Sequence, residues 1–270
     1  LARALVGAAG LIVRSRTKVD ADLIQAGSSL QVIGRAGVGV DNIDIDEATR
    51  RGIVVINAPA ANTYATVELA FALLLGSARR IPEADASMRS GQWKRKELRG
   101  TQLAGKTMGV VGVGRVGGEM AHRAQSFGMR VLAYKKGISE KPDTVDHLGR
   151  LDWLPELMAR SNVVMVCCPS TPETHKLLSH EQFDRLPEGS YMVNVSRGKI
   201  VDEEALLVAL RSGRLAGAGL DVTYTEPCPE DSPLWTERNV ILTSHSAGAS
   251  QYIRRRAMRL FIDNLHRYVK

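Results

Sequence analysis

The sequence predicts an α/β fold in which a parallel sheet is covered by helices. Two observations support this prediction. Short apolar runs alternate with helical patterns along most of the chain, which is typical of parallel sheets. One apolar run, Met108–Val111, also leads through a glycine-rich turn directly into a helical pattern. We therefore expect a doubly wound sheet organised around this strand, turn and helix.

The turn has the pattern Gly112-x-Gly114-x-x-Gly117, which is typical of dinucleotide-binding units. Gly112 would allow the tight turn, and Gly114 would let a pyrophosphate approach the backbone. Gly117 would let the helix pack closely against the strand. The start of that helix presents N–H groups and a partial positive charge to the phosphates. The pattern thus predicts a Rossmann-type dinucleotide-binding domain.

The residue that follows the next strand, Arg130–Tyr134, bears on the choice of cofactor. Dinucleotide-binding units commonly place Asp or Glu there, which binds the ribose 2′-OH. This chain has Lys135, followed by Lys136. Because an ammonium attracts the 2′-phosphate that a carboxylate would repel, we predict that NADP(H) is favoured, with NAD(H) still possible. The alternative is that Lys135 is a solvated lysine at a strand end.

The composition is that of an ordinary globular protein of one or two domains. The 270 residues are 44% hydrophobic, and no apolar run approaches the roughly 18 residues that a membrane span needs. The three cysteines include an adjacent pair in an apolar run, which argues against disulfides and favours a cytoplasmic setting. The net charge is +7, and most of the positively charged residues are scattered along the sequence. They either lie on solvated faces or attract anionic ligands. We expect neither a nucleic acid nor a membrane as a partner.

The remaining elements are predicted from periodicity and from turn residues. Strands are expected at Leu11–Val13, Gln31–Ile33, Ile53–Ile56, Val163–Val166, Tyr191–Val195, Ala218–Val222 and Val240–Thr243. Helices are expected at Ala21–Ala26, Asp46–Arg51, Val67–Arg79, Glu83–Arg89, Glu203–Arg211 and Gln251–Tyr268. We expect two lobes with a substrate cleft between them. Residues 59–251 would form the dinucleotide-binding domain, and residues 1–58 with 252–270 a substrate-binding lobe.

Three of the loops that follow strands each carry one titratable side chain: Arg197, Glu226 and His245. Ligands of parallel sheets bind at the carboxyl ends of the strands, so these loops should face one site. Each residue alone has a structural alternative, as a surface arginine, a turn residue before proline or a loop histidine. Their convergence beside a dinucleotide site favours a catalytic role.

Together these features resemble the D-isomer-specific 2-hydroxyacid dehydrogenases. The segments that carry the resemblance are Gly34-Arg-Ala-Gly-Val-Gly-Val-Asp-Asn-Ile-Asp44, the glycine motif, Ser196-Arg-Gly, Val201-Asp202, Leu220-Asp-Val, Glu226-Pro and His245. Residues 11–19 and 93–103 look most like the D-3-phosphoglycerate dehydrogenases of this family, whereas residues 232–268 look closer to general 2-ketoacid reductases. An NADPH-dependent glyoxylate or hydroxypyruvate reductase therefore remains an alternative. A dinucleotide-sensing scaffold, like the corepressors that share the fold, is a further one.

The resemblance implies hydride transfer between a nicotinamide and a small anionic D-2-hydroxyacid or 2-keto acid. His245 would be the acid/base, Glu226 would hold it and favour its protonated form, and Arg197 would bind the carboxylate or polarise the carbonyl. The implied cofactor contacts, which include the glycine motif, are Val38, Gly112, Gly114, Arg115, Val116, Gly117, Lys135, Cys168, Val195, Ser196, Asp221 and Gly248. The implied substrate contacts are Arg14, Ser15, Arg35 and Gly37. No metal is expected.

The family comparison also implies an architecture and an assembly. The smaller lobe would be flavodoxin-like, made from both chain ends, and its N-terminal part would be incomplete because members usually begin with a further strand and helix. A homodimer is expected, with the stretch from Val67 to Leu103 as its interface. The apolar residues of that stretch could equally belong to the core of one chain.

Overall fold

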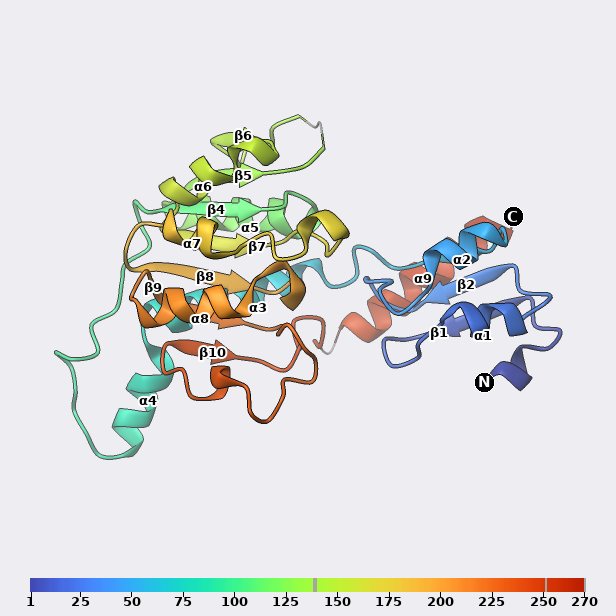
Figure 1. The fold of residues 1–270 in the computed structure, drawn as a ribbon, viewed down its shortest axis with the longest axis horizontal. Helices are drawn as coiled ribbons and strands as arrows, with labels where there is room; N and C mark the ends of the chain where they lie inside the picture. The colour runs from blue at the N-terminus through green and yellow to red at the C-terminus, as the bar shows by residue number, and fades with distance from the viewer. Residues whose placement is uncertain (138–139, 251, 270) are drawn as a thin grey trace. The chain divides into compact units, whose positions relative to one another are not determined.

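The computed structural model describes residues 1–137, 140–250 and 252–269. The chain divides into two compact units, which Figure 1 shows as ribbons. The larger unit comprises residues 64–247, and the smaller unit comprises residues 1–63 and 248–270. These divisions fall a few residues from the domain boundaries predicted from the sequence.

The larger unit is built on a parallel sheet of seven strands in the order β10-β9-β8-β7-β4-β5-β6. The strands are β4 (Thr107–Val111), β5 (Arg130–Tyr134), β6 (His147–Gly149), β7 (Val163–Val166), β8 (Ser190–Asn194), β9 (Leu215–Leu220) and β10 (Val240–Leu242). The strand order reverses between β4 and β7. In open α/β sheets, ligands bind at the carboxyl ends of the strands at this switch point.

Helices cover both faces of this sheet (Figure 1). They are α3 (Thr63–Ala78), α5 (Arg115–Ser126), α6 (Leu154–Arg160), α7 (His180–Asp184) and α8 (Glu203–Arg211). Helix α4 (Ile81–Arg89) projects away from the sheet (Figure 1). On one face Val110 packs with residues of α3 and α5, and on the other Val111 packs with residues of α6, α7 and α8. Successive strand residues point to opposite faces, so a strand covered on both sides has no polar face, and Met108–Val111 of β4 are all buried.

Strand β9 departs from this apolar pattern because it packs closely against α3. A Cβ added to Gly219 would lie 2.6 Å from Cβ of Leu73, so glycine lets the helix approach the sheet. The strand begins at Leu215, whereas the sequence predicts Ala218, because Leu-Ala-Gly is a weak strand signal.

The smaller unit is a three-stranded parallel sheet in the order β1-β2-β3. Its elements are η1 (Ala2–Leu5), β1 (Gly10–Val13), α1 (Ala21–Ala26), β2 (Val32–Arg35), α2 (Ile45–Arg50), β3 (Val54–Ile56) and α9 (Ile253–Val269). The side chains of Asp20 and Asp44 cap α1 and α2 by accepting hydrogen bonds from backbone N–H groups. Ile33 packs with α1 and α2, and the next residue, Gly34, lies under Phe261 of α9. The helices therefore cover both faces of this sheet as well.

The predicted fold class is confirmed, and the sequence missed only short elements. Strand β6 and helices α6 and α7 were not predicted, because β6 and α7 are very short and α6 spans only Leu154–Arg160. Helix α3 begins at Thr63, earlier than the predicted Val67. The predicted closing helix matches α9 from Ile253 onward, and Gln251 lies outside the described residues.

Candidate active site

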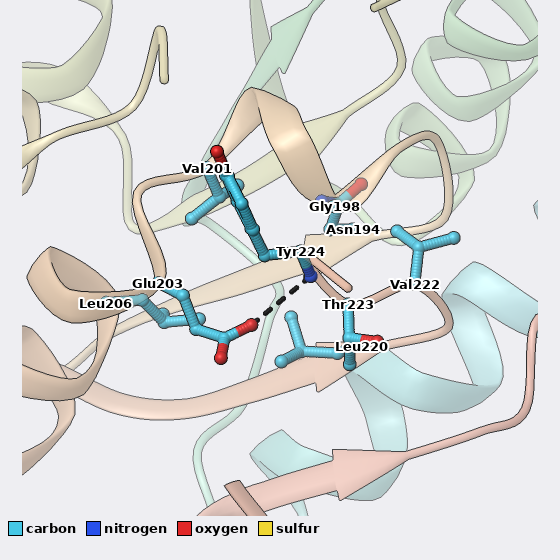
Figure 2. A pocket seen from close by; sticks show the side chains of 9 residues that line it. All are labelled: Asn194, Gly198, Val201, Glu203, Leu206, Leu220, Val222, Thr223 and Tyr224. Atoms are coloured by element: carbon cyan, nitrogen blue, oxygen red, sulfur yellow. Dashed lines mark hydrogen bonds between the residues drawn. The ribbon is translucent and has the colours of Figure 1, made fainter. Parts of the chain in front are cut away.

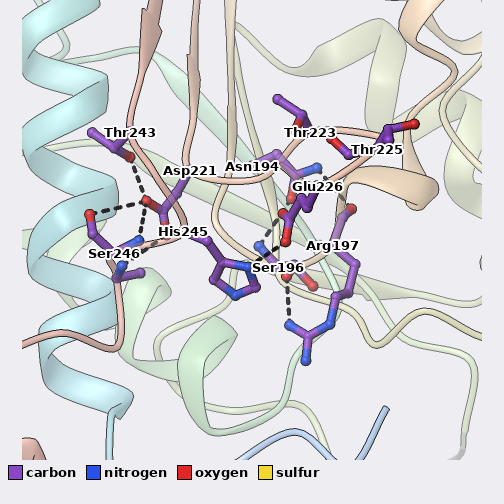
Figure 3. A network of polar contacts seen from close by, with 11 residues as sticks. Asn194, Ser196, Arg197, Asp221, Thr223, Thr225, Glu226, Thr243, His245 and Ser246 are labelled. Atoms are coloured by element: carbon purple, nitrogen blue, oxygen red, sulfur yellow. Dashed lines mark hydrogen bonds and ion pairs between the residues drawn. The ribbon is translucent and has the colours of Figure 1, made fainter. Parts of the chain in front are cut away.

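The three predicted catalytic residues follow β8, β9 and β10, which are neighbours in the sheet (Figure 3). Nδ1 of His245 lies 2.7 Å from Oε2 of Glu226. The guanidinium of Arg197 donates from Nη1 to the backbone oxygen of Ser196 at 2.7 Å, and its positive charge acts on both His245 and Glu226. The structure thus brings together the three side chains that the sequence singled out.

The electrostatics favour a charged pair. The hydrogen bond to Glu226 raises the pKa of His245; burial and the charge of Arg197 oppose this shift, while the charges of Glu226 and Asp221 add to it. Burial favours the neutral form of Glu226. The hydrogen bond and charge of His245, the backbone amide of Thr223 and the charge of Arg197 nevertheless prevail and lower the pKa of Glu226. The imidazole is therefore held toward its protonated form near neutral pH.

A buried carboxylate fixes the loop that carries His245. Asp221 is 1% exposed and accepts backbone hydrogen bonds from Ser246 and Ala247, each at 2.8 Å. The hydroxyls of Thr243 and Ser246 also donate to it (Figure 3). The backbone N–H of His245 donates to the carbonyl of Asp221 at 2.9 Å. Asp221 is predicted to contact the cofactor, and in the structure its carboxylate accepts hydrogen bonds from the loop that carries His245.

The backbone of His245 is in the left-handed region, with φ of 51°. A residue other than glycine occupies this region at a cost of about 1–3 kcal/mol and only where its surroundings enforce it. The hydrogen bonds to Asp221 on either side of His245 supply that enforcement. The backbone from which the imidazole projects is therefore held in one conformation.

The glycine turn has the geometry that a dinucleotide requires. Gly112 has φ of 102°, and a Cβ there would lie 2.6 Å from the backbone nitrogen of Cys168. A Cβ on Gly117 would lie 2.1 Å from the carbonyl oxygen of Gly112, so no larger residue fits at this position in the first turn of α5. A Cβ on Gly114 would meet nothing within 4 Å. The turn is thus tight where the chain packs and open where a pyrophosphate would approach.

The first turn of α5 completes this phosphate-binding geometry. The helix begins at Arg115, and its N-cap, Gly114, makes no side-chain cap. The leading N–H groups, which include those of Arg115 and Val116, are therefore not satisfied by a capping side chain and suit an anion. These residues fit a bound dinucleotide.

Two further loops border the turn. The hydroxyl of Ser196 donates to the carbonyl of Cys168, which ties the loop after β8 to the end of β7. Val195, beside Ser196, is buried. Burial raises the pKa of the Cys168 thiol to about 11, so this side chain stays a neutral, apolar wall.

Asn194, the last residue of β8, was not predicted as a site residue. It is 1% exposed, accepts from the backbone N–H of Ser196 at 3.0 Å and donates to the carbonyl of Arg197 at 3.0 Å. A buried amide thus shapes the turn that presents Arg197. The available signal was a polar residue at the end of an otherwise apolar strand.

The two lysines after β5 have different surroundings. Lys135 is half-buried, and its backbone N–H donates to Gly149 at 3.1 Å. Nζ of Lys136 lies 3.1 Å from Oε1 of Glu173, which follows β7. Hydrogen bonds from Thr171, from its own backbone and from Lys136 lower the pKa of Glu173 to about 2, so it is ionised. Because β5 and β7 flank β4, this ion pair links loops from both sides of the switch point.

The predicted substrate residues lie in the smaller unit, in the loop after β1, at the last residue of β2 and in the loop that follows β2. Nδ2 of Asn42 donates to the carbonyls of Arg14 and Thr17 at 3.1 and 2.6 Å, which fastens the loop that contains Ser15. Asn57 donates to the carbonyl of Val38 at 2.7 Å. Neither asparagine was predicted.

Two glycines of the smaller unit complete the predicted set. A Cβ on Gly37 would lie 1.3 Å from Nη1 of Arg35, so the guanidinium lies across the glycine backbone. Gly248 also belongs to this unit, where a Cβ would lie 3.5 Å from Nδ2 of Asn62. Val38, Gly248 and the predicted substrate residues thus lie in the smaller unit, and the other predicted site residues lie in the larger one.

The family of the chain follows from its similarity to known proteins. Residues 71–247 match the model of the D-isomer specific 2-hydroxyacid dehydrogenase, NAD binding domain. The chain belongs to this dehydrogenase family. The match spans the glycine turn and all three predicted catalytic residues.

Named relatives within the D-isomer specific 2-hydroxyacid dehydrogenases extend the similarity to most of the chain. A D-3-phosphoglycerate dehydrogenase of Archaeoglobus fulgidus is 48% identical over 242 residues, which are 89% of this chain and 46% of that protein. The chain therefore spans about half the length of the curated relatives that it matches.

Two solved structures have the same fold as this chain. The TT0316 protein from Thermus thermophilus superposes with a TM-score of 0.87 at 40% identity, over 96% of this chain and 83% of that one. An NADPH-dependent glyoxylate/hydroxypyruvate reductase from Sinorhizobium meliloti, in complex with NADP and malonate, gives 0.86 at 33% identity, over 97% and 81%.

Two kinds of feature are absent from the described part of this chain. Within residues 1–137, 140–250 and 252–269, no cluster of His, Cys, Asp and Glu has an arrangement suited to a metal ion. Over the same residues, no helix has the length and apolar character that crossing a membrane requires.

Proposed function

We propose that this chain catalyses hydride transfer between a nicotinamide cofactor and C2 of a D-2-hydroxyacid or 2-keto acid, in the manner of a D-3-phosphoglycerate dehydrogenase. The observation that carries the proposal is the 2.7 Å contact between His245 and Glu226. The positive charge of Arg197 acts on this pair, and the same unit contains the glycine turn suited to a dinucleotide. Family membership supports the same reaction class.

The residues divide the chemistry as follows. The bound cofactor supplies or accepts the hydride at C2 of the substrate. His245 engages Glu226 through Nδ1, so Nε2 is the nitrogen that donates a proton to the carbonyl oxygen during reduction and takes it back during oxidation. Arg197 binds the substrate carboxylate, since a guanidinium offers paired donors to paired oxygens. Hydride to carbon and proton to oxygen together balance the reduction of ketone to alcohol.

Substrate identity is tested with a panel of 2-keto acids that includes 3-phosphohydroxypyruvate, glyoxylate and hydroxypyruvate. We expect steady oxidation of the reduced cofactor, fastest with 3-phosphohydroxypyruvate. Higher kcat/KM with glyoxylate or hydroxypyruvate would support the rival reductase, which the similarity to the Sinorhizobium meliloti enzyme favours. Turnover with none of the panel would contradict the proposal and leave a dinucleotide-sensing scaffold.

The substrate contacts proposed are Arg14, Ser15, Arg35 and Gly37, which supply positive charge and backbone N–H groups for an anion. Asn42 and Asn57, which fasten the loops around them, support this assignment. Replacing Arg35 with Gln should raise the KM for the keto acid more than that for the cofactor. An equal rise in both would argue against the assignment.

The cofactor preference proposed is NADP(H) over NAD(H), because Lys135 follows β5 where a ribose-binding carboxylate is usual. In Lys135→Gln, we expect the KM for NADPH to rise about tenfold while that for NADH changes little. Arg130→Gln, which removes an exposed cation from the opposite end of the same strand, is the matched control. A wild-type preference for NADH would overturn the assignment.

We also propose that the chain forms a homodimer through α4 and the loop after it, in a cytoplasmic setting. Ile81, Met88 and Trp93 of this segment are 54%, 55% and 79% exposed, an apolar set that a second copy could cover. Light scattering should give twice the mass of the chain. A monomer at all concentrations would exclude the dimer.

A further inference from the structure

The loop that carries Glu226 is held at a second place, away from His245. Tyr224, two residues before Glu226, is half-buried and makes contacts with three residues: His175, Lys176 and Glu203. We name these four residues the Tyr224 anchor. Its contacts are separate from the hydrogen bonds through which Asp221 fixes the His245 loop.

The first contact of the Tyr224 anchor is made by the backbone. The backbone N–H of Tyr224 donates to Oε2 of Glu203, the first residue of α8, at 3.2 Å (Figure 2). A peptide N–H bonded to a carboxylate fixes the chain direction at that residue. The preceding residue, Thr223, has its own amide directed to the carboxylate of Glu226. The Tyr224 anchor therefore holds the backbone next to Glu226, the residue that bonds His245.

The side chain of Tyr224 makes the other two contacts. Its hydroxyl lies 3.2 Å from Nε2 of His175, and the ammonium of Lys176 lies 5.9 Å from its ring centroid. Lys176 is held in turn by Asp202, with Nζ 3.0 Å from Oδ2. A tyrosine whose backbone N–H, ring face and hydroxyl are all in contact with neighbours has few alternative rotamers.

The anchor also connects this loop to the segment that follows Arg197. The backbone N–H of Lys176 donates to Lys199 at 2.8 Å, and Leu178 forms a parallel bridge with Val201. A Cβ on Gly198 would lie 1.9 Å from the carbonyl oxygen of Thr223, so the two loops touch through a glycine. The pocket left between them, about 10 Å³, is close to the minimum for one water molecule and is a packing gap.

From this arrangement we infer that Tyr224 is a positioning residue: its anchor keeps Glu226 where it can bond His245. The inference rests on the proposed role of His245 as acid/base. The charged groups that act on His245 are Glu226 and Asp221, which favour its protonated form, and Arg197, which disfavours it. Loosening the anchor weakens only the Glu226 contribution, so the imidazole should lose its proton at lower pH.

The test is the variant Tyr224→Phe, which removes the hydroxyl and keeps the ring. The pKa of the His245 imidazole is measured by NMR titration, with its resonance assigned from His245→Gln. We expect a decrease of about half a unit, with a parallel shift of the pH profile for keto-acid reduction, equal to about threefold slower reduction at high pH. His175→Ala should shift the profile in the same direction. Tyr252→Phe, at a tyrosine that is 79% exposed, should change neither.

The outcomes separate the inference from the proposed function. An unchanged His245 pKa in both Tyr224→Phe and Tyr224→Ala, in folded protein by thermal melting, would overturn the positioning role. A shifted pKa in a protein that reduces no keto acid would support the anchor and contradict the dehydrogenase proposal. A lower melting temperature with an unchanged His245 pKa would assign Tyr224 a structural role only.

Discussion

Two groups of loops after the strands of the seven-stranded sheet, one carrying His245 and the other beside β5, are held by different interactions. At the His245 end, a carboxylate that is 1% exposed fixes the loop through backbone and hydroxyl hydrogen bonds. At the end beside β5, loops are linked by Lys136 and Glu173, whose side chains are 66% and 55% exposed. Buried charges with several hydrogen bonds resist rearrangement, whereas exposed ion pairs contribute about 0.2–1 kcal/mol. The fold therefore fixes the His245 loop firmly and holds the loops beside β5 only weakly.

The largest effect should come from removing the imidazole. His245→Ala should lower kcat by about 10²–10⁴-fold, because proton transfer by a positioned side chain contributes that much. The melting temperature and dinucleotide binding should stay near those of the unmodified chain, since the ring is half-exposed. His266→Ala, at an exposed histidine of α9, is the control. Turnover within a fewfold of normal would remove His245 from the mechanism.

Asp221→Asn tests, through the free energy of unfolding, how firmly the buried carboxylate holds the His245 loop. An amide has one acceptor oxygen, so the backbone N–H groups of Ser246 and Ala247 cannot both keep their partners. We expect urea unfolding to show a loss of about 2–3 kcal/mol, with a lower kcat because the His245 backbone relaxes. Asp263→Asn on exposed α9 should cost almost nothing. Equal stability of the two variants would mean that Asp221 does not fix the loop.

The pH dependence should reveal the paired state of His245. Its pKa in the folded chain is raised above its ordinary value of about 6.5, so the protonated form that reduction needs persists to higher pH. Reduction should fall, and oxidation rise, as pH increases through this raised pKa. The stability that the pair adds is present below about pH 6.5 and is lost as pH rises through the raised pKa. In Glu226→Gln both profiles should move to lower pH, and unmoved profiles would contradict the pairing.

The smallest effect should come from the exposed ion pair. Glu173→Gln should leave the free energy of unfolding almost unchanged, because the pair is well solvated. It frees Lys136, so the KM for NADPH should fall by a fewfold while that for NADH stays constant. Glu156→Gln, which breaks an exposed helical pair with Arg160, is the control for both readings. A stability loss as large as that of Asp221→Asn would abolish the contrast between the two ends.

The sequence was informative wherever a function depends on local spacing. The glycine turn, the residues after β8, β9 and β10 and the break in pattern at Lys135 can all be recognised in consecutive residues. Asn194, Asn42 and Tyr224 could not, because their roles depend on which atoms meet across loops far apart in the chain. Asp221 shows the same limit: its position near the end of a strand was predictable, but the loop that its oxygens hold was not.

The division of the chain into units has a consequence for biosynthesis. Residues 64–247 form one uninterrupted unit, whereas the smaller unit needs α9, which is made after all of them. Until Phe261 arrives over Gly34, one face of β2 has no cover. Because domains tend to fold as they emerge from the ribosome, the larger unit can reach its native state first. The three-stranded sheet can complete its packing only after α9 has been synthesised.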